Sequence, residues 1–209
     1  MRRIGRLAIA SGIVGILATV VLIAFYSLEA PQAVAAGAKT SRLGAINDAM
    51  GGVEYLLLAP VAAMFLPARE TLYRLAAIGG VAGLAGVAIV QELYVFGAIG
   101  AAVDYPAIAV GYALIGVWIA TASLVGGRSA HLPRGVTVLG VAIGVGMLLI
   151  PVGVFLLGGL GVMTAPKLVL NNYPFLASTA IAIVAIAIGL PVWSLWLGRQ
   201  LVRTDRTPA

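Results

Sequence analysis

Six apolar runs, each long enough for a membrane-spanning helix, limit what this chain can fold into. A hydrocarbon core about 30 Å thick takes roughly 20 apolar residues per helix. Inside lipid a spanning segment satisfies its backbone polar groups internally, which favours helices. We therefore expect an all-α bundle that forms one transmembrane domain over residues 1–209, with spans at about residues 7–27, 49–67, 74–100, 106–126, 134–158 and 173–197.

The composition excludes several classes of protein. Hydrophobic residues make up 62% of the chain and charged residues 10%, whereas soluble domains have about 45–50% and 25%. The net charge of +6 is scattered among short loops, which argues against a nucleic-acid-binding face. Because the chain has no Cys and one His, His131, we expect no Cys-zinc, iron–sulfur or paired-His site, no metal and no cofactor.

The basic residues predict the orientation of the bundle. If both termini lie on one side of the membrane, the opposite side keeps only Lys39, Arg42 and Lys167. The positive-inside rule then places both termini in the cytoplasm. The side that it assigns to the cytoplasm holds Arg2, Arg3, Arg6, Arg69, Arg74, Arg128, Arg134, Arg199, Arg203 and Arg206.

The first 36 residues allow a second interpretation. Their basic start and the small residues Ala33 to Ala36 are typical of a cleaved signal peptide. The apolar run from Leu7 to Tyr26 exceeds the roughly 7–15 residues of a signal-peptide core, which favours a retained span. Both interpretations stay open at this point, and cleavage would leave five spans.

Local signals set the expected ends and packing faces of the helices. Asn47 or Asp48 suits an N-cap for the second span, and Trp193 and Trp196 suit an aromatic belt at the membrane surface. GxxxG pairs allow close backbone packing within the chain, or with a homodimer or membrane-complex partner. The pairs are Gly79 with Gly83 and Gly140 with Gly144, and Pro67 marks the expected end of the second span.

Glu54 and Glu92 are the strongest functional signal, because each lies in an otherwise apolar span. An acidic side chain in hydrocarbon costs about 2.5 to 3.5 kcal/mol on insertion scales, so a partner, water or a function must compensate. Counted from the expected outer ends of their helices, the two acids lie at similar depths of about 8 and 12 Å. We therefore expect an outward-opening cavity where they bind a cation or proton, with Tyr55, Gln91 and Tyr94 as neighbours. Alternatively, each acid reaches water or accepts a structural hydrogen bond.

Two stretches resemble a known group of proteins. They are HLPRGVTVLGVAIGVGMLL, from His131 to Leu149, and PVWSLWLGRQL, from Pro191 to Leu201. The chain resembles uncharacterised six-span bacterial membrane proteins, grouped as a domain of unknown function, in which Leu-Pro-Arg opens the fifth helix and Pro-x-Trp…Gly-Arg closes the sixth. The resemblance implies a multi-pass protein of the bacterial cytoplasmic (inner) membrane, and it supplies no catalytic residues.

Three classes of function follow from these features. A transporter of a small solute, or one linked to protons or cations, would use the two acids on the outer side. A non-catalytic structural or assembly subunit of a membrane complex would use the short loops and glycine faces. An enzyme is disfavoured, because the sequence shows no nucleophile with a base at helical spacing. We expect a carrier, with the subunit as the alternative.

Overall fold

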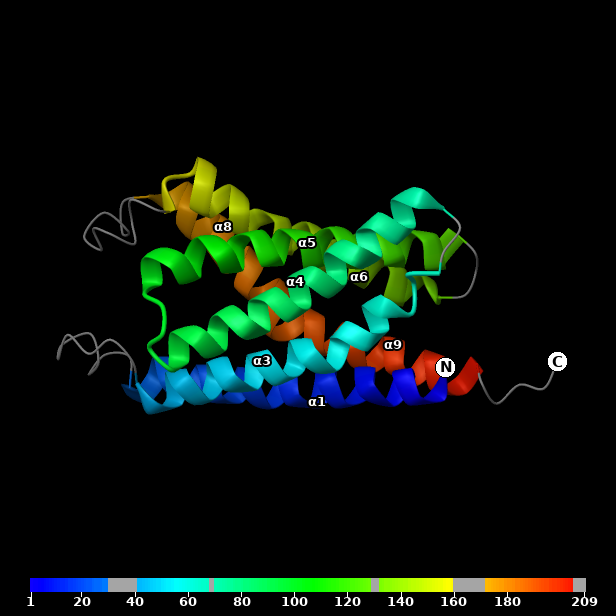
Figure 1. Cartoon of the computed structure of the whole chain (residues 1–209), viewed down its shortest axis with the longest axis horizontal. Coiled ribbons are helices and arrows are strands. Elements are labelled where there is room, and N and C mark those ends of the chain that lie inside the picture. Colours follow the sequence, from blue (N-terminus) through cyan, green and yellow to red (C-terminus); the bar gives the residue numbers. More distant parts are fainter. Residues whose placement is uncertain (30–40, 68–69, 129–131, 160–171, 205–209) are drawn as a thin grey trace.

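The computed structural model describes residues 1–29, 41–67, 70–128, 132–159 and 172–204. Within these ranges every regular element is helical, and contiguous elements join into six long rods (Figure 1). The elements are α1 (Arg2–Ala24), η1 (Phe25–Glu29), α3 (Arg42–Ala63), α4 (Thr71–Val95), α5 (Ala101–Arg128), α6 (Arg134–Pro151), η2 (Val152–Leu156), α8 (Tyr173–Val184), η4 (Ala185–Gly189) and α9 (Leu190–Thr204).

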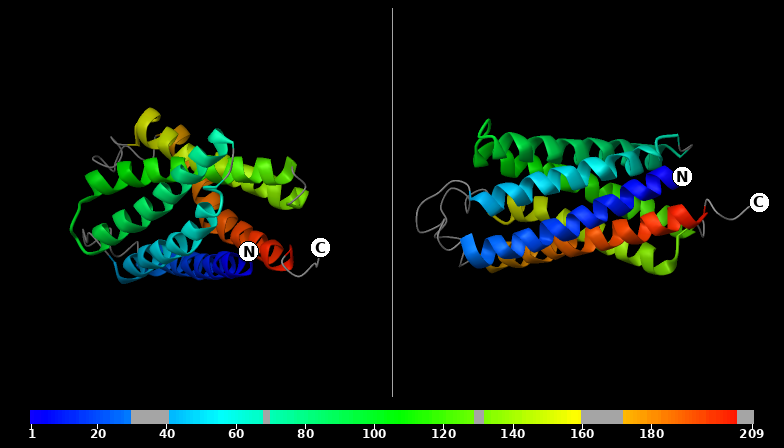
Figure 2. Two further views of the ribbon diagram at one scale, coloured as in Figure 1. Left: turned by 45° about the vertical axis from the view of Figure 1, so that its right-hand side comes forward. Right: turned by 90° about the horizontal axis from the view of Figure 1, so that it is seen from below.

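The rods form a closed ring. Each of α1, α3, α4, α5 and α6 packs along the next in chain order, α6 contacts α8 and η4, and α9 returns to pack along α1. The start of α1 and the end of α9 therefore lie at the same end of the bundle (Figures 1 and 2). We call this the N-terminal end and the other the opposite end.

Among the described residues, five helices are long and apolar enough to cross a membrane. The expected all-helical fold is confirmed for these residues, and its helices are compatible with a membrane protein. The five are Arg2–Glu29, Thr71–Val95, Ala101–Arg128, Arg134–Leu156 and Tyr173–Arg203. Helix α3 is not among them, because Asn47, Asp48 and Glu54 lower its hydropathy. Its 22 residues nevertheless extend about 33 Å, and it lies in the ring between α1 and α4.

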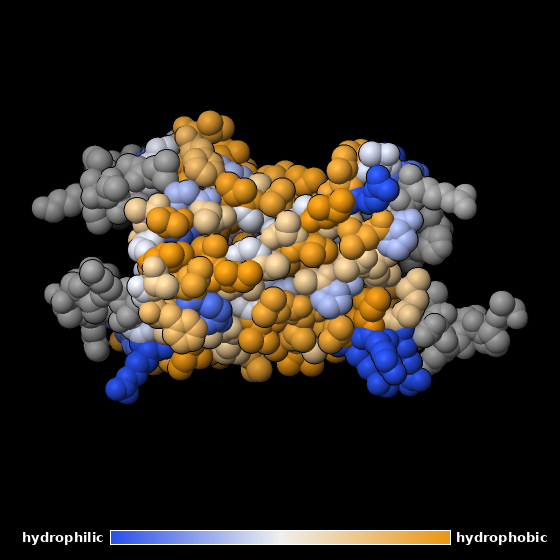
Figure 3. Space-filling model, in the orientation of Figure 1, coloured by the Kyte–Doolittle hydropathy of each residue, from blue (hydrophilic) through white to orange (hydrophobic). Residues whose placement is uncertain are grey.

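The apolar side chains are distributed as lipid requires. A band of hydrophobic residues covers the middle of the molecule, and hydrophilic residues gather at its two ends (Figure 3). Large apolar side chains such as Val20, Leu56 and Ile181 are more than half exposed. Because lipid is as apolar as these side chains, the bundle interior instead selects small residues that allow close packing.

The second predicted span begins earlier than expected, which corrects its predicted cap. Helix α3 starts at Arg42, and Ser41 is its N-cap, with Oγ accepting a hydrogen bond from the Gly44 amide at 3.0 Å. Glu29 accepts another from the Leu43 amide at 2.8 Å. These two acceptors satisfy amides that a helix start leaves free, so Asn47 and Asp48 lie inside the helix.

Other helix ends also differ from the prediction. Helix α4 ends at Val95, and a turn with Gly97 at φ 71° leads into α5, which starts at Ala101, before Pro106. Pro106 therefore lies inside α5, past its first turn, where its missing N–H removes one hydrogen bond of the helix. The last rod extends from Tyr173 to Thr204, past the predicted end at residue 197.

The predicted aromatic belt is wrong for Trp193. This side chain is 1% exposed and packs edge-to-face on Trp118 with ring centroids 6.0 Å apart. Trp196 is 38% exposed. The last rod turns Trp193 into the core because Leu190, Trp193 and Leu197 recur at helical spacing on its buried face.

Glycines hold the helices at close range. A Cβ on Gly83 of α4 would lie 2.7 Å from the Gly111 carbonyl oxygen of α5, and one on Gly116 would lie 2.6 Å from that of Gly144 in α6. The Gly79 position has more room, with its nearest contact at 3.5 Å. Within the described chain, Gly83 and Gly144 therefore serve intramolecular packing, and association with a partner through glycine faces stays a prediction.

Several sequence-based expectations fall outside the described residues. They comprise the possible signal-peptide cleavage site and loop residues, most of which were used to predict the orientation of the bundle in the membrane. They are residues 33–36, Lys39, Arg69, His131, Lys167 and Arg206.

The close contact at Gly83 generates a stability prediction. Gly83→Ala places a methyl group against backbone, so we expect a loss of about 1–3 kcal/mol in unfolding free energy. The matched variant is Gly86→Ala in the same helix, where no atom lies within 4 Å of the new Cβ. It should be neutral or stabilising by up to about 1 kcal/mol. Thermal unfolding in detergent measures both, and equal stability of the two variants would contradict the packing described.

Candidate functional site

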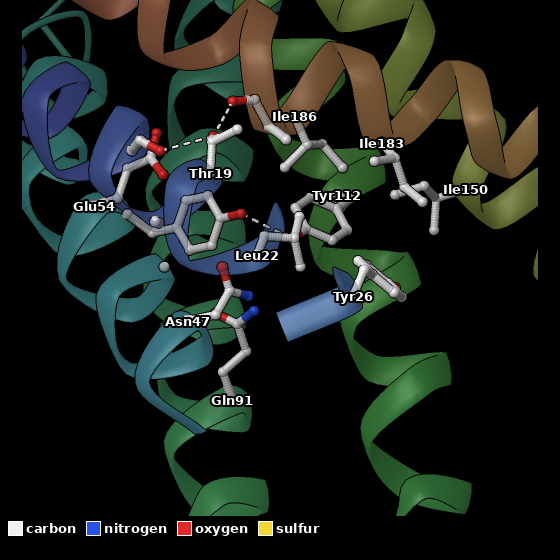
Figure 4. A pocket seen from close by; sticks show the side chains of 15 residues that line it. Thr19, Leu22, Tyr26, Asn47, Glu54, Gln91, Tyr112, Ile150, Ile183 and Ile186 are labelled. Carbon is white, nitrogen blue, oxygen red and sulfur yellow. Dashed lines mark hydrogen bonds between the residues drawn. The ribbon is translucent and has the colours of Figure 1, made fainter. Parts of the chain in front are cut away.

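A cavity of about 230 Å³ lies inside the ring, in the half of the bundle towards the opposite end. Each of the six rods contributes to its lining (Figure 4). Its polar lining side chains are Thr19, Tyr26, Asn47, Glu54, Tyr55, Gln91 and Tyr112. Of the residues predicted from the sequence, the structure brings Glu54, Tyr55 and Gln91 together here.

Glu54 is the buried acid of this cavity. Its side chain is 4% exposed, and Oε1 has no hydrogen-bond partner. It lies against Gly15 of α1, where a Cβ would overlap the carboxylate and would approach the Pro191 ring at 2.6 Å. Ser11 anchors the adjacent backbone by donating from Oγ to the Glu54 carbonyl oxygen at 3.1 Å. Glycine on α1 therefore creates the space that the carboxylate occupies.

Two tyrosines form one wall of the cavity. The hydroxyl oxygens of Tyr55 and Tyr112 are 2.8 Å apart in a hydrogen bond, and their rings meet edge-to-face with centroids 6.0 Å apart. Both side chains are buried. The pair joins α3 to α5 across the ring and fixes the aromatic wall beside Glu54.

Amide side chains lie at another part of the lining. Gln91 of α4 packs on Gly51 of α3, since a Cβ on Gly51 would lie 3.3 Å from Gln91 Oε1. That oxygen is buried and has no hydrogen-bond partner. Asn47 points towards Gln91 (Figure 4) and donates from Nδ2 to Asp48 Oδ1 at 3.3 Å. Among the described lining residues, the two buried side-chain atoms without a hydrogen-bond partner are the Oε1 atoms of Glu54 and Gln91, and both are acceptors.

Wide helical turns adjoin the cavity. The described chain contains three π-helical segments. Tyr26 lies in η1, Ile186 and Ala187 lie in η4, and Ile150 lies two residues before η2. All four of these residues line the cavity. Thr19 Oγ1 donates to the Gly15 carbonyl at 2.9 Å and also contacts the Ala187 carbonyl of η4. Single π-helical turns occur frequently at functional sites because they redirect backbone groups.

The remaining wall is aliphatic. Ile150 and Ile183 lie on the side of the cavity away from Glu54 (Figure 4). Ile183 is 43% exposed and Tyr26 is 59% exposed, so the cavity reaches the surface of the bundle beside these two residues. The cavity is thus polar at one side and apolar at the other.

The structure does not bring Glu92 into this cavity. Glu92 lines a separate surface depression with Leu56, Ile89 and Phe96. It packs on Gly52, where a Cβ would lie 2.9 Å from Glu92 Oε1. Residues 52 and 54 are about 200° apart around a helix. Glu92 of α4 therefore packs against one face of α3, and the Glu54 side chain leaves α3 from the nearly opposite face. Tyr94 lines neither cavity.

Helical periodicity on α4 distinguishes Gln91 from Glu92. On α4 the buried positions Leu84, Val87 and Ala88 continue in register to Gln91, whereas Glu92 follows the exposed Ile89. That spacing places Gln91 at the centre of the buried face and Glu92, four residues after Ala88, at its edge. Thr19 and Tyr112 carry no comparable signal, because other uncharged polar residues occur in the same apolar helices, such as Ser11 in α1 and Ser123 in α5.

Comparison with protein-family models, with curated proteins and with solved structures gives no match. Nothing about the cavity is therefore transferred from another protein.

The tyrosine pair generates a stability prediction. Tyr55→Phe and Tyr112→Phe each leave the other buried hydroxyl without its partner, which costs about 1–3 kcal/mol of unfolding free energy. The double variant should lose less than the sum of the two single losses. Tyr105→Phe, at a site 39% exposed, is the control and should change stability little. Additive losses in thermal unfolding would contradict the pairing.

Proposed function

We propose that this chain is an integral protein of the bacterial cytoplasmic membrane with six spans and both termini in the cytoplasm, like the six-span group that it resembles. The charge distribution supports this orientation. Among the described residues, Arg42 is the one basic residue at the opposite end, and the N-terminal end holds Arg2, Arg3, Arg6, Arg74, Arg128, Arg134, Arg199 and Arg203. Such an excess of arginine is typical of cytoplasmic loops.

The orientation is tested with single cysteines, because the native chain has none. Glu70→Cys and Gly100→Cys place exposed thiols just before α4 and between α4 and α5. A membrane-impermeant maleimide should label Gly100→Cys on intact cells and Glu70→Cys only after permeabilisation. Labelling with the opposite preference would contradict the proposed orientation.

For the function itself, we propose a carrier that binds a proton or small cationic solute at Glu54, from the extracytoplasmic side. The observation that carries this proposal is a carboxylate 4% exposed, with an unpaired oxygen, on a cavity lined by every rod of the bundle. Acidic residues inside a membrane bundle typically mark ion or substrate pathways. Binding at Glu54 needs no covalent step, so the proposal is not that of an enzyme.

The core supports a site that is closed towards the cytoplasm. Nearer the N-terminal end, the ring is filled by fully buried side chains that include Leu58, Val61 and Trp118. A bound cation therefore has to wait for a rearrangement before it can leave on that side. The π-helical segments beside the cavity are the places where the helices deviate from regular hydrogen bonding.

The carrier is tested by charge movement in proteoliposomes on a solid-supported membrane. Jumps in H⁺, Na⁺, K⁺ or ammonium concentration should displace charge in the wild type. Glu54→Gln keeps the shape of the side chain and removes its charge. We expect the charge displacement to fall at least about tenfold, because the variant loses a charge-assisted contact with the cation.

Glu92→Gln is the matched control, because it makes the same chemical change in a different depression. It should leave the displacement unchanged. No displacement with any of the four cations, or an equal displacement in Glu54→Gln, would contradict a carrier centred on Glu54.

A further inference from the structure

We infer that the ligand of the Glu54 cavity is a small aliphatic ammonium ion, with its charged head at Glu54 and its alkyl tail against the isoleucine wall. This inference rests on the proposed function and names its substrate class. It combines three features of the cavity: unpaired acceptors, aromatic rings and a separate aliphatic side.

The acceptors select a hydrogen-bond donor. Among the described residues that line the cavity, Glu54 Oε1 and Gln91 Oε1 are the buried side-chain atoms without a hydrogen-bond partner, and each can accept from an N–H or O–H of a ligand. A buried acceptor without a partner costs about 1–3 kcal/mol, and more if it is charged. A primary ammonium brings three N–H donors together with the positive charge that the carboxylate lacks.

The aromatic wall favours the same charge. Tyr55 and Tyr112 line the cavity beside Glu54 and are fixed by their mutual hydrogen bond. An organic cation over a tyrosine ring gains about 0.5–2 kcal/mol when it is desolvated. An anion would be repelled by the Glu54 carboxylate, so the lining discriminates by charge.

The charge of the bound cation follows from the number of carboxylates in the cavity lining. Among the described residues, Glu54 is the one acidic side chain that lines the cavity, so one positive charge neutralises it. A calcium ion takes about six to eight oxygen ligands. Across the described part of the chain, no three His, Cys, Asp or Glu side chains are grouped so as to hold a metal ion.

The aliphatic side accounts for the tail. Leu22, Ile150, Ile183 and Ile186 line the cavity without offering a polar atom. Glu54 and Ile183 face it from different sides (Figure 4), so a ligand that spans it is charged at one end and apolar at the other. A volume of about 230 Å³ limits that ligand to a short chain, because drug-sized ligands occupy pockets of about 300–1,000 Å³.

Calorimetric titration of the purified full-length protein tests the inference with a charge series. The probes are n-butylammonium, 1-butanol and butyrate, which share a tail and differ in the head. We expect saturable binding of n-butylammonium, with 1-butanol at least about tenfold weaker because it lacks the charge. Butyrate should not bind. Equal binding of butanol and butylammonium would overturn the inference.

Variants then assign the head and the tail. Glu54→Gln should weaken n-butylammonium at least about tenfold, and Gln91→Leu about three- to tenfold, while Glu92→Gln should have no effect. Butylammonium should bind about fifteenfold more tightly than ethylammonium, at about fourfold for each buried methylene. Ile183→Ser should reduce that difference and leave ethylammonium unchanged. Wild-type affinity in Glu54→Gln, or equal affinity for the two amines, would overturn the assignment.

The outcomes separate the substrate class from the carrier itself. If n-butylammonium does not bind while H⁺, Na⁺, K⁺ or ammonium jumps still displace charge through Glu54, the substrate class is wrong and the carrier stands. If neither occurs, both are wrong. Correct size-exclusion profiles of the Glu54→Gln and Glu92→Gln proteins show that a loss of binding is not a loss of fold.

Discussion

Close backbone contact between helices is the interaction on which this bundle depends. In lipid, apolar side chains gain nothing by leaving their surroundings, so helices associate by packing closely enough for dispersion forces and polar contacts. Gly5 meets the Gly198 carbonyl between α1 and α9, Gly83 meets that of Gly111 between α4 and α5, and Gly116 meets that of Gly144 between α5 and α6. These contacts fasten three helix pairs of the ring.

The same packing explains how an acid is kept inside the bundle. Gly15 leaves the space for the Glu54 carboxylate. The neighbouring Gly12 lets α1 pack closely on α9, since a Cβ at this position would lie 2.6 Å from the Pro191 carbonyl oxygen. Within the described residues, three of the rods contain π-helical turns, and the cavity lies beside them. Fully buried side chains such as Leu58 and Val61 fill the ring nearer the N-terminal end, so the cavity lies towards the opposite end.

The buried polar groups that line the cavity fall into two kinds. Some satisfy one another, as the hydroxyls of Tyr55 and Tyr112 do at 2.8 Å. Others, such as Glu54 Oε1 and Gln91 Oε1, have no partner and face the cavity. Since an unpaired buried acceptor is costly, the second kind indicates a ligand, whereas the first kind builds the wall that holds it. The proposed ammonium site follows from this division.

The sequence by itself determined the helical class, the long apolar helices and the unequal distribution of arginine, because these depend on residue type and order alone. It also predicted that Glu54, Tyr55 and Gln91 lie close together, and these three residues line one cavity. Only the tertiary structure decided that Glu92 faces away, that Trp193 is buried and that Tyr112 completes the wall. The reason is rotational: a helix places neighbouring residues about 100° apart, and which face turns inward is set by packing against other helices.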